Sequence, residues 1–199
     1  MMQNNVKIAI TGGICSGKST VAKIIKEQGY PVISCDEIYH ELLNDKSFVN
    51  SIVKEFGNVK NAGGTLNREK LAEIVFNDKD KLQVLNSVTH PQIMNRAMQL
   101  MSGCGIFFCE VPLLFEGNYE VLFDNVIVVL RNKDERIKEL MLRAKINESQ
   151  AKLRINSQYE YENHSFAGYY VTHNYGNLEE LQSAVLSMIT QIEKDYIKN

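Results

Sequence analysis

Several features that mark specialised classes of protein are missing from this sequence of 199 residues. The longest apolar runs are about as long as Val126–Leu130. They are far shorter than the roughly twenty residues that a membrane-spanning helix needs. The first five residues lack the charged and apolar regions of a secretory signal, so we expect none. Tryptophan is absent and there are only three prolines, but the remaining composition is that of an ordinary globular protein.

Cysteine is sparse and shows no pairing pattern. The four residues are Cys15, Cys35, Cys104 and Cys109, with no C-x-x-C spacing and no neighbouring histidine cluster. This arrangement predicts neither a zinc site nor a disulfide framework. Reduced thiols in a soluble, cytoplasmic protein are the simplest interpretation.

A surplus of positive charge is also missing. Lysine and arginine together number 22 against 24 acidic residues, and no basic stripe is visible. This balance argues against nucleic acid or an anionic membrane as a partner. Because the chain has no internal repeat and no Pro- or Ser-rich linker, we expect a single domain, and a monomer is favoured.

What the sequence does contain is an alternation of short apolar segments with longer segments of helical pattern. Most of the short segments are apolar at nearly every position, as expected of strands that are covered on both faces. The alternation predicts a parallel α/β sheet. The expected strands are Lys7–Thr11, Pro31–Ser34, Ile106–Cys109, Asn125–Leu130 and, less clearly, Tyr169–His173.

The helical patterns lie between these strands and after the last one. Thr20–Gln28 follows the first strand, and Leu178–Ile197 closes the chain with one apolar face. Polar residues dominate Asn132–Ser165, which predicts a largely solvated helical hairpin. A helical insertion is expected between the second and third strands, with the patterns Glu37–Leu43, Phe48–Phe56, Arg68–Asn77 and Lys81–Val88.

A phosphate-binding loop is the most specific motif. The pattern G-x-x-x-x-G-K-[ST] directly follows the first expected strand and directly precedes a helix, which is the context that the motif requires. Successive backbone N–H groups of such a loop converge on one anion, assisted by the positive end of the helix. Lys18 would reach the β- and γ-phosphates, and the Ser19 hydroxyl would bind Mg²⁺. The nucleotide-binding residues are therefore Gly12, Gly13, Ile14, Cys15, Ser16, Gly17, Lys18, Ser19 and Thr20.

Cys15 lies inside this loop, beside a cation and a helix N-terminus. The favoured interpretation is that Cys15 is a small residue that only fills space. The other hypothesis is that this environment lowers the pKa of its thiol, in which case ATP would slow its alkylation.

Guanine-nucleotide switches do not fit the sequence. They carry a D-x-x-G motif, and no aspartate here is followed by glycine three positions later. Asn132–Glu135 resembles the guanine-reading N-K-x-D motif, but its last residue is glutamate. Guanine specificity is therefore not expected, and the loop alone does not separate kinases from ATP-driven motors.

Phosphoryl transfer needs an acid that organises Mg²⁺ and an acid near the acceptor hydroxyl. In a doubly wound sheet, such residues are found at the carboxyl ends of strands. Glu110 ends the third expected strand and would act on Mg²⁺ through a water molecule; its alternative is a solvated carboxylate. Asp36 follows the second strand and would face the transferred phosphate; its alternative is an N-cap for a helix that begins at Glu37.

Positive charge for the transferred phosphate would come from the polar insertion, through Arg136, Arg143 and Arg154. A mobile segment suits this task because its closure excludes water. Glu139 and Arg143 are spaced i, i+4, so a simple pair on the helix surface is the alternative for Arg143.

Together these residues resemble the dephospho-coenzyme A kinase family over nearly the whole chain. The loop segment Ile8–Thr20 matches the family's nucleotide loop. The more discriminating matches are Asp36 within Cys35–Ile38, the cluster of Leu66, Arg68 and Leu71, His90-Pro91, Val111–Glu116, Arg143, Arg154, Gln158 and Asn174–Gly176.

The resemblance implies a fold and a division of the chain. The fold is an α/β P-loop NTPase with a doubly wound five-stranded parallel sheet of order 2-3-1-4-5, a helical acceptor-binding insertion and a short helical lid. One P-loop kinase domain then spans residues 1–199. Its core comprises 1–35, 102–131 and 166–199, the acceptor-binding insertion 36–101 and the lid 132–165.

The resemblance also implies an activity, with ATP and Mg²⁺ as co-substrate and cofactor. The γ-phosphate of ATP is transferred to the ribose 3′-hydroxyl of 3′-dephospho-CoA, giving CoA and ADP, the last step of CoA synthesis. The alternatives are a kinase of another small acceptor, such as a nucleoside monophosphate, and a non-enzymatic nucleotide-binding switch.

Residue roles follow from the same resemblance. Asp36 becomes the acid that orients and deprotonates the acceptor hydroxyl, and Arg143 a lid arginine on the phosphates. Asn174 lies in the loop that faces the adenine. The acceptor-binding residues are Asp36, Arg68, His90, Pro112, Leu113 and Glu116. Two alternatives stay open: His90-Pro91 as a helix end, and Leu113, Leu114 and Phe115 as core.

The sequence departs from the family pattern at several positions. The family usually has glycine at position 15, aspartate at 110 and Asp-Ala-Asp at 34–36. It also has glutamine at 136, arginine at 139 and Ala-Asp at 168–169. None of these changes removes Lys18, Ser19, Asp36 or Arg143, so we expect a diverged but active enzyme.

Overall fold

The computed structural model describes residues 5–76 and 78–197. It divides into two compact units, one made of Met1–Ile33 with Met101–Asn199 and the other of Ser34–Leu100. Residues 1–4, to which the expectation about a secretory signal refers, lie outside the described residues, as does Asn77, the last residue of one expected helix.

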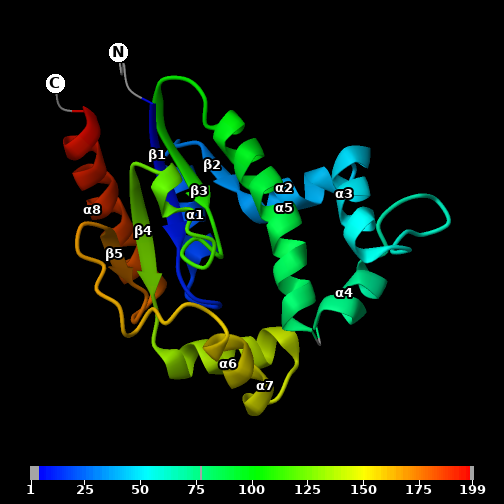
Figure 1. Cartoon of the computed structure of the whole chain (residues 1–199). Helices are drawn as coiled ribbons and strands as arrows, with labels where there is room; N and C mark the ends of the chain where they lie inside the picture. The colour runs from blue at the N-terminus through cyan, green and yellow to red at the C-terminus, as the bar shows by residue number, and fades with distance from the viewer. Residues whose placement is uncertain (1–4, 77, 198–199) are drawn as a thin grey trace. The chain divides into compact units, whose positions relative to one another are not determined.

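A five-stranded sheet organises the first unit (Figure 1). Its order, β2-β3-β1-β4-β5, confirms the expected 2-3-1-4-5. The central strand β1 pairs in parallel with β3 and with β4, and β4 pairs in parallel with β5. The strands are β1 Asn5–Thr11, β2 Val32–Ser34, β3 Gly105–Glu110, β4 Asn125–Leu130 and β5 Tyr170–His173, each within two residues of its expected range.

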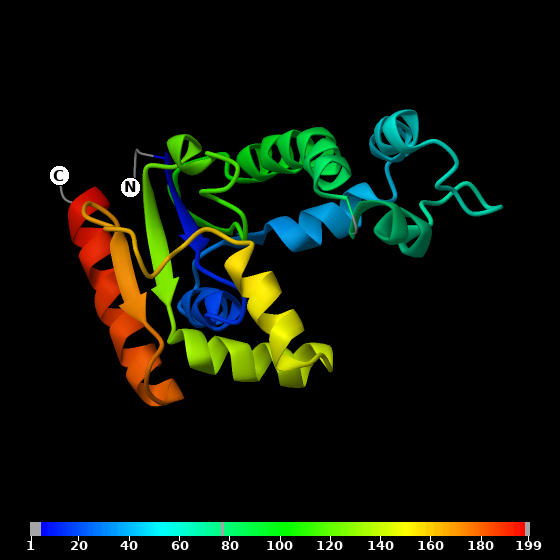
Figure 2. The same cartoon turned by 60° about the horizontal axis from the view of Figure 1, so that its bottom comes forward.

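Burial on both faces explains why the strand sequences are almost continuously apolar. In β1, Ile8 and Ile10 point into the cluster formed with helices α1 (Lys18–Glu27) and α8 (Leu178–Ile197). Ala9, between them, is equally inaccessible on the opposite face. Figure 2 shows α8 running alongside β5, and α1 enters the cluster through Val21, Ala22, Ile24 and Ile25.

The expected helical hairpin is formed by α6 (Lys133–Ala144) and α7 (Glu148–Asn156). Asn147 begins α7 with a capping box, in which its side chain and that of Gln150 bond each other's backbone N–H groups. The two helices pack through Ile137, Leu140, Ala151 and Ile155, and this cluster also includes Ile14 and Cys15 of the phosphate-binding loop. The base of the hairpin is therefore joined to the loop by apolar packing.

The second unit is helical and has a hydrophobic core of its own. Phe48, Ile52, Val59 and Leu71 are its most buried members. Its helices are α2 Cys35–Leu42, α3 Lys46–Phe56, α4 Arg68–Phe76 and α5 Lys79–Leu100.

The interpretation of His90-Pro91 as a helix end is wrong, because both residues lie inside α5. Proline removes one backbone donor from the helix. Close to it, two side chains bond carbonyl oxygens one turn back: Thr89 Oγ1 donates to Leu85 O and Gln92 Nε2 to Val88 O, each at 2.8 Å. The helix continues because Ile93, Met94 and Ala97 are buried farther along it. Neither α5 nor another helix of the described ranges is long and apolar enough to cross a membrane.

Removing side-chain volume from the central sheet should destabilise the protein. Ile127 in β4 is fully buried, so Ile127→Ala loses apolar contacts and leaves a cavity, with an expected cost of about 2–5 kcal/mol. Leu142→Ala is the control, because Leu142 is 78% exposed on α6 and its truncation should change stability by less than about 0.5 kcal/mol. Urea unfolding followed by circular dichroism measures both; equal stabilities would contradict the assigned core.

Candidate active site

The phosphate-binding loop turns between Thr11, the last residue of β1, and Lys18, the first of α1. Gly12 and Gly17 have positive φ angles of 152° and 99°. A Cβ atom at Gly12 would overlap the Val129 carbonyl oxygen, and one at Gly17 would overlap the side chain of Asn174. Both positions therefore require glycine for space as well as for conformation.

Lys18 is folded over this loop. Its ammonium group donates to the carbonyl oxygens of Gly12 at 2.8 Å and Gly13 at 3.0 Å. Gly13 O also accepts the N–H of Ser16 at 3.0 Å, which closes the turn. The lysine charge, the loop amides and the N-terminus of α1 thus lie in one small region, where an anion of several charges is favoured.

Ser19 and Glu110 meet beside the loop. The Ser19 hydroxyl donates to Glu110 Oε1 at 2.8 Å, and the parallel pairing of β1 with β3 places Glu110 opposite Ile10. A hydroxyl and a carboxylate are hard oxygen donors, which fit Mg²⁺ when substrate phosphates supply further ligands. Within the described ranges, no group of three or more His, Cys, Asp and Glu side chains could hold a metal ion.

The hypothesis of a lowered Cys15 pKa is contradicted. Burial raises the pKa of the Cys15 thiol above its ordinary value, and Glu139 adds to the rise. The positive charges of Arg143, Lys18 and Arg131 act in the opposite direction but do not outweigh desolvation. The thiol is packed against the α6–α7 cluster, which the sequence position alone does not reveal.

Arg143 and Asn174 approach the same loop from different elements. Arg143 is exposed in the last turn of α6 and close enough to influence the Cys15 thiol. No ion pair joins it to Glu139 among the residues that the structure describes. Asn174, which follows β5, donates from Nδ2 to Ser16 O at 2.9 Å.

Asp36, Arg68 and His90 all belong to the second unit. Asp36 is exposed in the first turn of α2. It is not the N-cap, because α2 begins at Cys35 and the Ser34 hydroxyl accepts the N–H of Glu37 at 3.3 Å. Arg68 is exposed at the start of α4, and burial lowers the pKa of the half-buried His90, which favours its neutral form.

The segment Val111–Glu116 follows β3 in the first unit. Pro112 and Leu113 are half-buried, whereas Leu114 is fully buried and belongs to the core, as its alternative interpretation held. Glu116 is exposed and accepts the backbone N–H of Tyr159 at 3.0 Å. The ring of Phe115 lies against Tyr159, Tyr161, Phe166 and Tyr169.

Arg136 differs from the expectation of a solvated lid cation. It is buried in the first half of α6 and bonded to the backbone of Ile14 and to Glu162. Gln158 bonds Ile14 as well. Arg154 is exposed on α7. Apart from the presence of an arginine in a polar segment, no feature of the sequence pointed to these contacts of Arg136.

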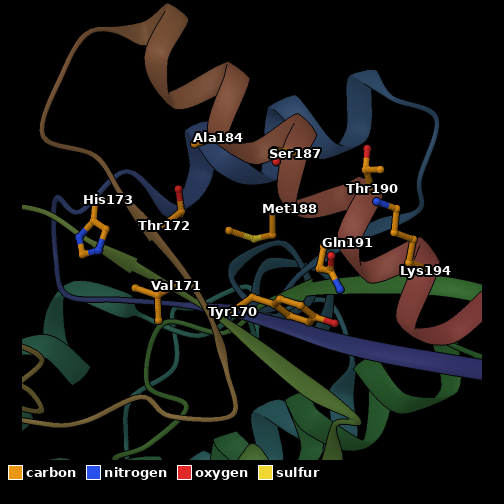
Figure 3. A pocket seen from close by; sticks show the side chains of 10 residues that line it. All are labelled: Tyr170, Val171, Thr172, His173, Ala184, Ser187, Met188, Thr190, Gln191 and Lys194. Atoms are coloured by element: carbon orange, nitrogen blue, oxygen red, sulfur yellow. The ribbon is translucent and has the colours of Figure 1, made fainter.

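Cavities of the first unit lie both beside the phosphate-binding loop and away from it. One of about 210 Å³ adjoins Gly13 and Arg136, with Tyr161, Glu162 and Tyr175 in its wall. Another, of about 600 Å³, lies between β5 and α8 (Figure 3). No residue expected to bind nucleotide or acceptor lines this second cavity; its walls include Tyr170, His173, Met188 and Lys194.

Comparison with known proteins decides the family. Residues 6–180 match the family model described as dephospho-CoA kinase. The chain belongs to this family. A dephospho-CoA kinase of Fusobacterium nucleatum is 36% identical over 177 residues, which are 87% of this chain and 92% of that protein. A dephospho-CoA kinase of Listeria monocytogenes is 33% identical over 195 residues, with 94% and 98% covered.

Solved structures agree with the dephospho-CoA kinase assignment. A Thermus thermophilus protein superposes with a TM-score of 0.76 at 31% identity, covering 94% of this chain and 97% of that one. Dephospho-CoA kinase from Campylobacter jejuni gives a TM-score of 0.69 at 30% identity, covering 95% and 98%. The resemblance noted from the sequence motifs is thereby confirmed.

The raised pKa of Cys15 has a measurable consequence. In a Cys104→Ser background, which removes the exposed cysteine, the pH midpoint for alkylation of Cys15 by iodoacetamide should lie above that of N-acetylcysteine, because burial disfavours the thiolate. Mass spectrometry of the modified peptide gives the rate at each pH. ATP should slow the reaction further by covering the loop. A midpoint below that of the free thiol would contradict the effect of burial.

Proposed function

We propose that this protein transfers the γ-phosphate of ATP to the 3′-hydroxyl of the ribose in 3′-dephospho-CoA, giving CoA and ADP, the last step of CoA synthesis. The observation that carries the proposal is the family match over residues 6–180. The contacts of Lys18 and Ser19 support it, because they bring a cation and a metal-binding hydroxyl to one phosphate-binding loop.

On the nucleotide side, the loop amides and Lys18 bind the β- and γ-phosphates, and Asn174 lies on the adenine side. Ser19 would hold Mg²⁺ directly and Glu110 through a water molecule; the ion would neutralise charge on the phosphates. Arg143 adds positive charge as the γ-phosphate moves. The proximity of Arg143 to Cys15 supports this role, since Cys15 belongs to the loop.

On the acceptor side, Asp36 orients the 3′-hydroxyl and accepts its proton as the oxygen attacks the γ-phosphorus. The bond from that phosphorus to the oxygen of the β-phosphate breaks, and ADP leaves with the electron pair. Arg68 and His90 of the helical insertion are proposed to bind the acceptor, and the same role is proposed for Pro112, Leu113 and Glu116 of the segment that follows β3. The exposed position of Asp36, directly after β2, supports this assignment.

We place the reaction in the cytoplasm. Among the described residues, no disulfide joins Cys15, Cys35, Cys104 and Cys109, which suits a reducing compartment. The monomeric state stays a prediction, to be measured by light scattering.

An acceptor panel tests the activity. ADP release should be rapid with ATP and dephospho-CoA, and slow with AMP, UMP or no acceptor. Lys18→Ala should reduce turnover more than a hundredfold, about 3 kcal/mol or more, because the developing phosphate charge loses its main cation. Faster turnover with a nucleoside monophosphate would favour another small-acceptor kinase. ATP binding without any acceptor-dependent release would favour a nucleotide switch.

The role of Asp36 has its own test. Asp36→Asn keeps the size of the side chain but removes its basicity, so kcat should fall about a hundredfold or more while the Kd for ATP changes little. Glu37→Gln is the matched control, because Glu37 is the exposed neighbouring acid of α2. Steady-state kinetics and calorimetry separate the two effects. Equal kcat values for Asp36→Asn and the unmodified protein would remove Asp36 from the mechanism.

A further inference from the structure

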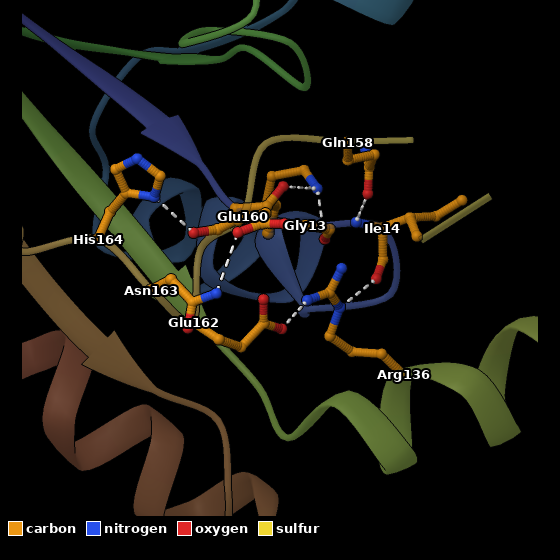
Figure 4. A network of polar contacts seen from close by, with 10 residues as sticks. Gly13, Ile14, Arg136, Gln158, Glu160, Glu162, Asn163 and His164 are labelled. Atoms are coloured by element: carbon orange, nitrogen blue, oxygen red, sulfur yellow. Dashed lines mark hydrogen bonds and ion pairs between the residues drawn. The ribbon is translucent and has the colours of Figure 1, made fainter. Parts of the chain in front are cut away.

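The backbone of Ile14 is held on both sides by side chains from a distant part of the chain (Figure 4). Its N–H donates to Gln158 Oε1 at 2.6 Å, and its carbonyl oxygen accepts from Arg136 Nε at 3.0 Å. Arg136 comes from α6 and Gln158 from the segment directly after α7. A backbone unit of the phosphate-binding loop is thus fixed by two elements outside the loop.

Arg136 is buried to an extent that is unusual for arginine. Its side chain is only 3% exposed, and its charge is paired with Glu162, whose side chain is 41% exposed. Burying a guanidinium group is costly unless it is paired and bonded. Here the planar group uses separate N–H donors for Glu162 and for Ile14, which a lysine ammonium cannot reproduce with the same geometry.

The guanidinium group also lies against Gly13. A Cβ atom at Gly13 would overlap it, so glycine at this position makes room for Arg136. Gly13 O is one of the two carbonyl oxygens that receive the Lys18 ammonium group. Arg136 therefore contacts the part of the loop that sets the position of Lys18.

The chain next to the carboxylate partner is anchored as well. Glu162 follows Tyr161, whose hydroxyl lies 3.1 Å from the Thr11 hydroxyl at the end of β1 and whose ring is buried. Apolar packing of Ile14 and Cys15 against α6 and α7 adds to these contacts. The pair is built on elements that are themselves fixed, as a positioning contact requires.

We propose that Arg136, oriented by Glu162, is a positioning residue that holds Gly13 and Ile14 in the conformation that binds the triphosphate of ATP. The proposal rests on the proposed function only for the identity of the nucleotide. Arg136 acts through the loop and through Lys18, and does not touch the phosphates. Losing it should weaken the binding of ATP, since a loop that must be ordered by its ligand binds less tightly.

The experiment measures the Kd for ATP by isothermal titration calorimetry without acceptor, so that a failure of the acceptor assignment leaves the result unaffected. Arg136→Gln and Arg136→Lys should each raise the Kd about tenfold, which corresponds to about 1.4 kcal/mol. At saturating ATP, kcat should change less than KM for ATP. Lys138→Gln is the matched control, because it removes an exposed positive charge from the same helix.

Two results would overturn the proposal. If Arg136→Lys has the same Kd for ATP as the unmodified protein while Arg136→Gln has a higher one, the positive charge alone accounts for the effect and the planar geometry does not. If both variants melt at a lower temperature but keep the original Kd, Arg136 only stabilises the fold. Should Arg136→Gln fail to fold, Arg136→Lys decides between positioning and these outcomes, because it retains the charge and loses only the planar geometry.

Discussion

The shape of one backbone turn, Gly12–Gly17, determines what the first unit can do. The turn has to bring amides and the Lys18 ammonium group to one place, and it therefore leaves no room for side chains at its glycines. Its surroundings are arranged to preserve this shape: Val129 O and Asn174 close against Gly12 and Gly17, and Ile14 is bonded from both sides. Such preorganisation favours the binding of a highly charged ligand. The loop is already ordered in the folded protein, so the free energy of binding is not reduced by the cost of ordering it.

The strands and this loop were predictable from sequence because both depend on local rules. A strand buried on two faces is apolar at consecutive positions, and the order of glycines, lysine and serine between strand and helix reflects the geometry of phosphate binding. The contact of Ser19 with Glu110 joins residues 91 positions apart and is not local. It agrees with the separate assignment of both residues to Mg²⁺, and Glu110 ends a strand that the family resemblance places next to β1.

Features that depend on contacts distant in the chain were not predictable. The bond from Arg136 to Ile14 joins residues 122 positions apart, and no local pattern distinguishes Arg136 from the exposed Arg154. The pKa of Cys15 follows from burial against α6 and α7, which overrides the local cations. The length of α5 was missed because Pro91 suggests a break, while buried residues on both sides of it, such as Thr89 and Ile93, keep the helix intact.

The two arginines of helix α6, Arg136 and Arg143, differ in how firmly they are held. Arg136, in its first half, is buried and bonded to the loop, whereas Arg143 lies seven residues farther on, about 10 Å along the axis, and is exposed. The same helix thus supplies one arginine whose position is set by the protein and another that is available to a ligand. A cation that must follow a phosphate during transfer needs freedom at its own end and a firm attachment at the other. On the proposed role of Arg143, the ion pair of the buried Arg136 with the partly exposed Glu162 provides that attachment, a reason to keep a charge where an apolar side chain would be less costly.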